Sequence, residues 1–353
     1  MVWDRRSVAL TAVGAAVVVA LAAGSIVYAI HHGTAGKLAS APKPAPAQSQ
    51  PPLPPPGPLL SPFTGEPVHR LKRVLIVKIG NTVPERPATG LARADIVYLI
   101  PVEGGLSRIM AVFSSHYPKV IGPVRSARQD DLQLLRQFGR PAFAWSGAQP
   151  QLVPVVEHSP IVDLYALNVG GYFRSVDRVE PYNLFADTRT LVKEAPHASV
   201  ARNIGFRFGP PPAGGHPRRA ESVSYPAASF RFRWSPAKGR WLIWMDGAPA
   251  ISTGAGQLSA PTVVIQRVVV GLSRFLEQGP MMPPDAETVG SGTATVLRNG
   301  QAFQARWSRP SAHGGTTFTT DSGKPMTFAR GPVWVVLAYG PGSSKWRGGK
   351  PVP

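Results

Sequence analysis

Residues 61–208 combine short apolar runs with helical patterns. Three runs are rich in β-branched residues, are bounded by Gly or Pro, and predict buried strands at Val74–Ile79, Ile96–Val102 and Ile109–Ser114. Helical spacing predicts two helices, Asp130–Phe138 closed by Gly139 and Thr188–Ala195 capped by Asp187. Because strands alternate with helices, this region is expected to form an α/β N-terminal domain.

Residues 223–339 follow a period of two instead. Phe230, Phe232 and Trp234 alternate with Arg231 and Arg233, which predicts a strand with aromatic residues on one face and arginines on the other. Further strands are predicted at Trp241–Met245, Pro261–Val270, Thr293–Arg298, Gln301–Trp307 and Val333–Tyr339, with tight turns at Asp246-Gly247 and Asn299-Gly300. The pattern predicts a mainly antiparallel β C-terminal domain, joined by a linker over residues 209–222 and followed by a disordered tail over residues 340–353.

The N-terminal segment predicts a membrane anchor. Ser7 to Ile30 carries no charged side chain and would form a helix of roughly 36 Å, enough to cross about 30 Å of hydrocarbon. Arg5 and Arg6 precede it, so residues 1–6 are expected in the cytoplasm and the bulk of this single-pass protein outside the cell membrane. A cleaved signal peptide is the alternative, because Ala20-Leu21-Ala22 resembles a cleavage site. Residues 31–60 are Pro-rich and predict an extended, disordered spacer.

Composition narrows the chemistry. The 38 Lys and Arg residues against 19 Asp and Glu give a net charge of +19, which favours anionic partners; a compositional preference for arginine is the alternative explanation. Nucleic acid is not expected as a partner outside the membrane. The absence of cysteine excludes disulfides, thiolate metal sites and cysteine nucleophiles. The eight His residues are scattered, so neither a metal site nor a cofactor is expected.

Charged residues interrupt the apolar strands of the first domain. Asp95 opens one predicted strand, Glu103 closes it, and Arg108 follows. Arg125 and Arg128 then stand at the entry to the first predicted helix, where guanidinium groups and free backbone N–H groups favour an anion. The alternative is a buried ion network that only holds the strands in register.

A Gly- and Arg-containing loop over residues 170–184 adds further polar groups, although solvated arginines in a turn explain it equally well. The predicted ligand-binding residues are Arg108, Arg125, Ser126, Arg128, Arg174, Arg178 and Asn183, with Asp95 and Glu103 as candidate catalytic carboxylates.

Several motifs carry a resemblance to a known family. They include Val102-Glu103-Gly104-Gly105, Ile121 to Arg128, Ala144-Trp145-Ser146-Gly147 and Pro181-Tyr182-Asn183-Leu184. In these motifs the sequence resembles the YerB-like family of bacterial extracytoplasmic proteins, a domain of unknown function with N- and C-terminal parts. The resemblance implies an envelope location, but many relatives are lipoproteins anchored through a cysteine that this chain lacks. It implies no established reaction, and Tyr182 stands where relatives often carry His.

Two functions remain open at this point. The first is binding of an anionic cell-envelope ligand, such as a lipid-linked glycan pyrophosphate, through the arginines; an enzyme at this site would transfer phosphoryl or glycosyl-phosphate groups. The second is a non-catalytic binding or scaffold module in which the arginines serve the structure.

Overall fold

The computed structural model describes residues 57–275, 283–347 and 350–352, which belong to one compact unit. The predicted anchor over residues 7–30 and most of the predicted spacer lie outside the described residues. Among the described residues, no helix combines the length and apolar character that a membrane crossing requires.

The first half of this unit contains all three α-helices of the described residues and nine strands. The strands are β1 (Leu75–Gly80), β2 (Ala88–Thr89), β3 (Ile96–Pro101), β4 (Ser107–Phe113), β5 (Val120–Ile121), β6 (Ala142–Trp145), β7 (Val162–Tyr165), β8 (Tyr172–Arg174) and β9 (Leu184–Asp187). The helices are α2 (Gln129–Arg136), α3 (Val153–Glu157) and α4 (Thr188–Glu194), with 3-10 turns η1 (Val83–Glu85), η2 (Leu91–Arg93) and η3 (Glu103–Gly105).

The second half consists of strands alone. They are β10 (His216–Pro217), β11 (Ala220–Tyr225), β12 (Ala228–Ser235), β13 (Arg240–Met245), β14 (Ala248–Pro249), β15 (Ile251–Thr253), β16 (Gly256–Gln257), β17 (Ser259–Ala260), β18 (Thr262–Val268), β19 (Val270–Leu272), β20 (Pro284–Ala286), β21 (Gly290–Arg298), β22 (Gln301–Arg309), β23 (Thr317–Thr320), β24 (Val333–Tyr339), β25 (Lys345–Arg347) and β26 (Lys350–Val352). The described chain is therefore mostly β with few helices.

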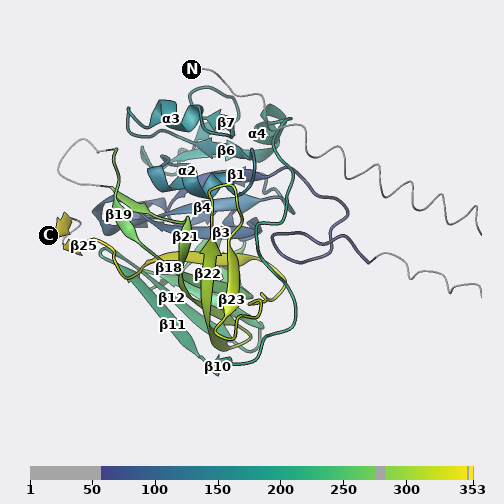
Figure 1. The fold of residues 1–353 in the computed structure, drawn as a ribbon. Coiled ribbons are helices and arrows are strands. Elements are labelled where there is room, and N and C mark those ends of the chain that lie inside the picture. The colour runs from purple at the N-terminus through teal and green to yellow at the C-terminus, as the bar shows by residue number, and fades with distance from the viewer. Residues whose placement is uncertain (1–56, 276–282, 348–349, 353) are drawn as a thin grey trace, which may run out of the picture. The chain divides into compact units, whose positions relative to one another are not determined.

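One large sheet receives strands from both halves. Its order is β10-β22-β21-β18-β24-β3-β4-β1-β6-β7, with β23 paired to β22 (Figure 1). Strand β24 pairs in parallel with β3, so the last long strand of the chain lies beside one of the first. Strands β18, β24, β3, β1, β6 and β7 all run in the same direction, because β4 is antiparallel to both β3 and β1.

Each face of the large sheet is buried, which explains the continuous apolar runs in its central strands. On one face, Val77 of β1 and Val97 of β3 join a core with Phe232 and Trp241 of the separate sheet β11-β12-β13-β14, and with Leu191 of α4. On the other face, apolar residues of the same strands pack against α2 and α3. We call this second side the α2 face.

The predicted elements are confirmed at most positions. Gly139 follows α2 with a φ of +83°, and the Asp187 side chain accepts a hydrogen bond from Thr190 N at the start of α4. Asp246 and Asn299 both adopt a φ of 50° in their turns. Phe230 and Phe232 are buried while Arg231 and Arg233 are exposed, as the alternation predicts.

The C-terminal end differs from expectation. Residues 340–353 were expected to be disordered, yet Gly340 N donates to Val268 O, and Ser344 N donates to Val270 O. Strands β25 and β26 then pair with each other. Small residues in this segment allow its backbone to continue the hydrogen bonding of β18 and β19, which composition alone does not reveal.

We predict that the unit unfolds in a single cooperative transition. Val97 and Leu99 of β3 share a core with Trp334 and Val336 of β24, so neither half of the chain can lose its structure without exposing the core of the other. Calorimetry of the full-length protein should give one folded-unit transition, with a ratio of calorimetric to van't Hoff enthalpy close to one. Two separate transitions, each assigned to one half by proteolysis, would contradict the prediction.

Candidate functional site

The candidate site lies where the co-directional strands end. The carboxyl ends of β1, β3 and β6 meet at one edge of the large sheet, and ligands of such sheets commonly bind outside this edge. Glu103 follows β3, and Arg108 lies near the beginning of β4 at the same edge, because Arg108 is in register with both Gly80 and Ile100. We call this region the carboxyl edge.

The segment from residue 121 to 128 crosses this edge between β1 and β6. Arg125 N donates to Lys78 O at 2.9 Å, and Ser146 N donates to Arg125 O at 3.1 Å. Ala127 N donates to Gly147 O at 2.8 Å, and the chain then enters α2. These backbone bonds fix the positions from which the Arg125 and Arg128 side chains start.

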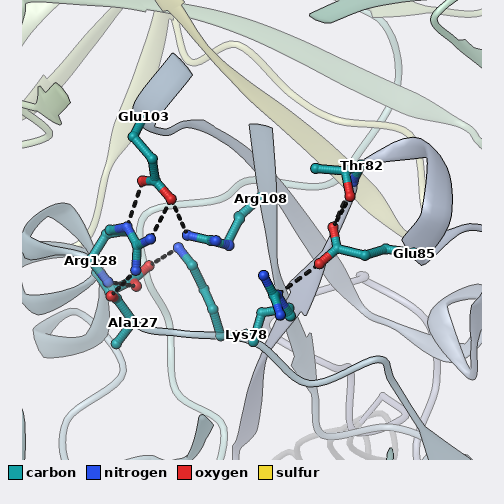
Figure 2. A network of polar contacts seen from close by, with 9 residues as sticks. Lys78, Thr82, Glu85, Glu103, Arg108, Ala127 and Arg128 are labelled. Carbon is teal, nitrogen blue, oxygen red and sulfur yellow. Dashed lines mark hydrogen bonds and ion pairs between the residues drawn. The ribbon is translucent and has the colours of Figure 1, made fainter. Parts of the chain in front are cut away.

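Glu103 is shared by two arginines. Its carboxylate lies 3.1 Å from Arg108 Nη1, and it accepts a hydrogen bond from Arg128 Nε at 2.7 Å as well as one from Arg128 Nη2 (Figure 2). Burial alone would raise the pKa of Glu103, but the charges of Arg108 and Arg128 outweigh it and hold that pKa well below its usual range. Glu103 is therefore a firmly ionised ion-pair partner and a weak base.

A second ion pair lies deeper, on the α2 face. Lys78 Nζ is 2.5 Å from Asp131 Oδ1, and both side chains are fully buried. Asp131 also accepts a hydrogen bond from Arg128 N at 2.8 Å through its other oxygen. A buried charge requires such a partner, so this pair ties strand β1 to the first turn of α2.

The third ion pair joins Glu85 to Arg125. The Arg125 Nε to Glu85 Oε1 distance is 2.7 Å, and the other carboxylate oxygen accepts hydrogen bonds from Thr82 N and Thr82 Oγ1, each at 2.7 Å. Glu85 lies directly over Gly80, where a Cβ would come within 2.2 Å of the Glu85 carboxyl carbon. Glycine is therefore required at position 80 for this arrangement.

Among the described residues, the carboxyl edge has more cationic side chains than carboxylates paired with them. Four cationic side chains, Lys78, Arg108, Arg125 and Arg128, face three paired carboxylates, Glu85, Glu103 and Asp131. The neighbouring Asp130 forms no ion pair within the described residues, and burial raises its pKa well above the ordinary range despite the nearby Lys78. Burial and the charge of Arg128 lower the pKa of Arg108 to about 10, so Arg108 stays cationic at neutral pH.

The other predicted residues lie around this edge or away from it. Ser126 lies between the two arginines of the crossing segment, with its Oγ 3.7 Å from where a Cβ of Gly147 would be. Arg178 donates to Glu85 O at 2.7 Å and to Pro87 O at 2.6 Å, so it joins the 170–184 loop to the segment that carries Glu85. Arg174 forms an ion pair with Glu180 and also donates to Asn183 Oδ1. The side chains of Arg174 and Asn183 therefore contact each other within the loop.

Asp95 lies at the opposite end of the sheet. It precedes β3, and its Oδ2 accepts hydrogen bonds from Ser114 N and Ser115 N beyond the end of β4. Arg108 and Phe113 are five positions apart along β4, or about 17 Å of strand. Asp95 therefore holds the turn after β4 in place and does not accompany the arginines.

Three charged residues of the network were not predicted from the sequence. Lys78 carried a signal, because it interrupts the apolar run Val74–Ile79 on a face that is otherwise buried. Asp131 follows the first residues of a predicted helix, where acidic residues are common and draw no attention. Glu85 had no signal, because only the fold brings it over Gly80.

We predict that the Lys78 and Asp131 pair is a major source of stability. Lys78→Met leaves the Asp131 carboxylate buried without its cation and should lower the free energy of unfolding by about 3–5 kcal/mol, measured by urea denaturation at pH 7. The double variant Lys78→Met/Asp131→Asn removes both charges and should recover part of that loss. A single Lys78→Met substitution with unchanged stability would contradict the prediction.

Asp95 should make stability depend on pH. Burial raises its pKa from 3.8 to about 6, although hydrogen bonds from Ser115 and Ser114 act in the opposite direction. Asp95 therefore stays protonated to a higher pH in the folded state than in the unfolded state. Its contribution to the free energy of unfolding falls by about 3 kcal/mol as pH rises from 4 to 7. Asp95→Asn should remove that fall in urea denaturation across this range, and parallel pH profiles for the two proteins would contradict it.

Comparisons with known proteins agree with this architecture. Two family models match, "Protein of unknown function (DUF3048) N-terminal domain" over residues 63–201 and the corresponding C-terminal domain over residues 222–335. A protein named "Putative lipoprotein YerB" from Bacillus subtilis (strain 168) is 37% identical over 126 residues, which is 35% of this chain and 38% of that protein.

A solved structure shares the fold. The crystal structure of the YerB protein from Bacillus subtilis superposes with a TM-score of 0.69 at 20% identity, covering 79% of this chain and 96% of that one. The two family models together cover more than half of the sequence and both of the halves that build the large sheet. The chain therefore belongs to the YerB-like DUF3048 family.

Proposed function

We propose that this protein is held at the outer face of a cell membrane and binds an anionic envelope ligand at the carboxyl edge of its large sheet. The observation that carries the proposal is the excess of cationic side chains over paired carboxylates in the part of this nearly buried network that the structure describes. An excess charge in a poorly solvated place is unfavourable, and a bound anion relieves it.

Arg108 is the group that meets the ligand in this proposal. Its Nη1 is engaged by Glu103, whereas its Nε and Nη2 have no acceptor within the described part of the protein. The Arg108 side chain is 10% exposed and the Arg125 side chain 17%, so an anionic group can reach them from the edge of the sheet. A guanidinium with two free donors favours a phosphate or carboxylate oxygen.

The ion pairs limit what this site can bind. Glu103 and Glu85 already pair with the arginines of the carboxyl edge. Among the described residues, the positive charge that remains can be balanced by about one negative charge on a ligand. We therefore propose that one phosphate of a lipid-linked glycan pyrophosphate, or a similar anion, contacts Arg108 while the rest of the ligand lies outside.

Binding is better supported than phosphotransfer. Glu103 is held ionised by two arginines, and Asp95 lies at the far end of β3 and β4. Neither carboxylate combines a base-like pKa with a position beside Arg108.

The envelope location is supported by the relative and by the N-terminal sequence. The name of the Bacillus subtilis relative describes a lipoprotein, and this chain contains no cysteine that could carry a lipid. In this proposal, residues 7–30 serve as the anchor and the Pro-rich residues that follow separate the folded unit from the membrane.

A scaffold without a ligand is the second candidate. It is favoured by the carboxylate partner that each arginine of the carboxyl edge has in the structure. A scaffold role requires the ion pairs but not the additional positive charge of Arg108. The two candidate functions therefore predict different effects of removing Arg108.

We predict that Arg108→Ala strongly weakens anion binding without unfolding the protein. The substitution leaves three cations paired with three carboxylates, because Glu103 keeps Arg128. Pyrophosphate and inorganic phosphate should raise the melting temperature of the full-length wild-type protein, and Arg108→Ala should weaken this binding at least tenfold in calorimetric titrations while its own melting temperature changes by only a few degrees.

Arg189→Ala is the matched control, because Arg189 is exposed on α4 and lies outside the carboxyl edge. It should bind pyrophosphate as the wild type does. A wild-type protein that neither anion stabilises would reject the ligand hypothesis in favour of the scaffold, as would an Arg108→Ala variant with undiminished binding.

A further inference from the structure

A second arginine-rich region lies on the outer side of the sheet β11-β12-β13-β14, far along the chain from the carboxyl edge. Strand β12 alternates, so Phe230 and Phe232 are packed in the core while Arg231 and Arg233 face outward. The same alternation that builds the core thus puts two guanidinium groups on one exposed surface.

Neighbouring segments add two more arginines. Trp234 N donates to Arg219 O at 3.0 Å, and Arg218 N donates to Gly300 O at 2.8 Å. These backbone bonds hold the entry to β11 between β12 and the turn that joins β21 to β22. The entry to β11, strand β12 and this turn together line a cavity of about 690 Å³. We call it the arginine groove; its lining includes Arg218, Arg219, Arg231, Arg233, Asn299 and Gln301.

The arginine groove carries a large excess of positive charge. Its one carboxylate contact within the described residues is Glu221, which lies 3.4 Å from Arg218 Nε on a partly exposed surface. Arg219 and Arg231 have no acidic partner in the part of the chain that the structure describes. Four guanidinium groups against one carboxylate leave three unbalanced positive charges.

Among the described residues, the lining of the groove includes one aromatic side chain, Trp234, which is partly buried. The guanidinium of Arg233 lies 5.3 Å from the ring centroid of Trp244, and Trp234 packs against Trp241 with their ring centroids 5.4 Å apart. Binding of single-stranded nucleic acid usually relies on open aromatic faces on which bases stack. Beside this one tryptophan, the arginine groove presents mainly guanidinium and amide donors, which recognise phosphate oxygens.

We propose that the arginine groove binds a linear polymer that carries closely spaced phosphate groups, through contacts to the phosphates alone. Three excess charges match several phosphates in a row, and the cavity lies within the range of about 300–1,000 Å³ that is typical of ligand sites. The groove shares no residue with the carboxyl edge, so it is a binding site in addition to the one proposed above.

The test is binding of linear inorganic polyphosphate, about fifteen units long, to the full-length protein at several salt concentrations. The wild type should bind it, with an affinity that falls as salt rises. Arg219→Ala/Arg231→Ala should weaken binding at least tenfold and lose most of the salt dependence, because it removes two unpaired guanidinium groups that make no ion pair in the fold.

Two controls make the outcome decisive. Arg306→Ala removes an exposed arginine of β22 that does not line the groove and should leave polyphosphate binding unchanged, which separates the groove from the overall charge of +19. Arg189→Ala removes an exposed arginine of α4 that belongs neither to the groove nor to the carboxyl edge, and it should also leave polyphosphate binding unchanged. Equal losses in Arg306→Ala and the double variant would overturn the proposal, as would tighter binding of poly-aspartate or of oligo-dT than of polyphosphate.

Discussion

The ion pair between Lys78 and Asp131 is the interaction on which the candidate site depends. A lysine inside the apolar strand β1 is costly to bury unless a carboxylate meets it, and Asp131 of α2 does so while fully enclosed. The same Asp131 accepts the backbone N–H of Arg128, so the pair fixes the point at which Arg128 leaves the chain. Arg128 then holds Glu103 at the end of β3. One buried pair thus begins a chain of contacts that links β1, α2 and the end of β3 (Figure 2).

This network has a structural and a functional consequence that must be kept apart. The ion pairs of Lys78, Arg125 and Arg128 join the ends of the strands to α2 and to the segments that cross this edge. They do not explain why Arg108 is present, because Glu103 is already satisfied by Arg128. A group that adds a nearly buried positive charge without being needed for pairing lowers stability unless something else uses it. Arg108 therefore differs from the neighbouring arginines in that the ion pairs do not require it.

The sequence predicted the local structure well and the site in part. Strand alternation at Phe230–Trp234 and the turns at Asp246-Gly247 and Asn299-Gly300 were visible because each depends on neighbouring residues alone. The pairing of β24 with β3 was not, since it joins residues more than 200 positions apart and leaves no periodic signal. The arginines of the motif ending at Arg128 were identified, but their carboxylate partners Glu85 and Asp131 were not. Which acid meets which arginine is decided by strand order, and the strand order emerges only in the folded chain.

The two arginine regions differ in the solvent around their charges, and this difference decides what each can recognise. At the carboxyl edge the guanidinium groups are nearly buried and mostly paired, so an anion bound there as proposed would meet strong, weakly screened interactions. In the arginine groove the charges are exposed and, apart from that of Arg218, without an acidic partner among the described residues, so each contact is weaker and more sensitive to salt. A polymer compensates for weak contacts by making several of them, whereas a single anionic group cannot. We therefore propose a single anionic group for the buried site and an extended chain for the exposed groove.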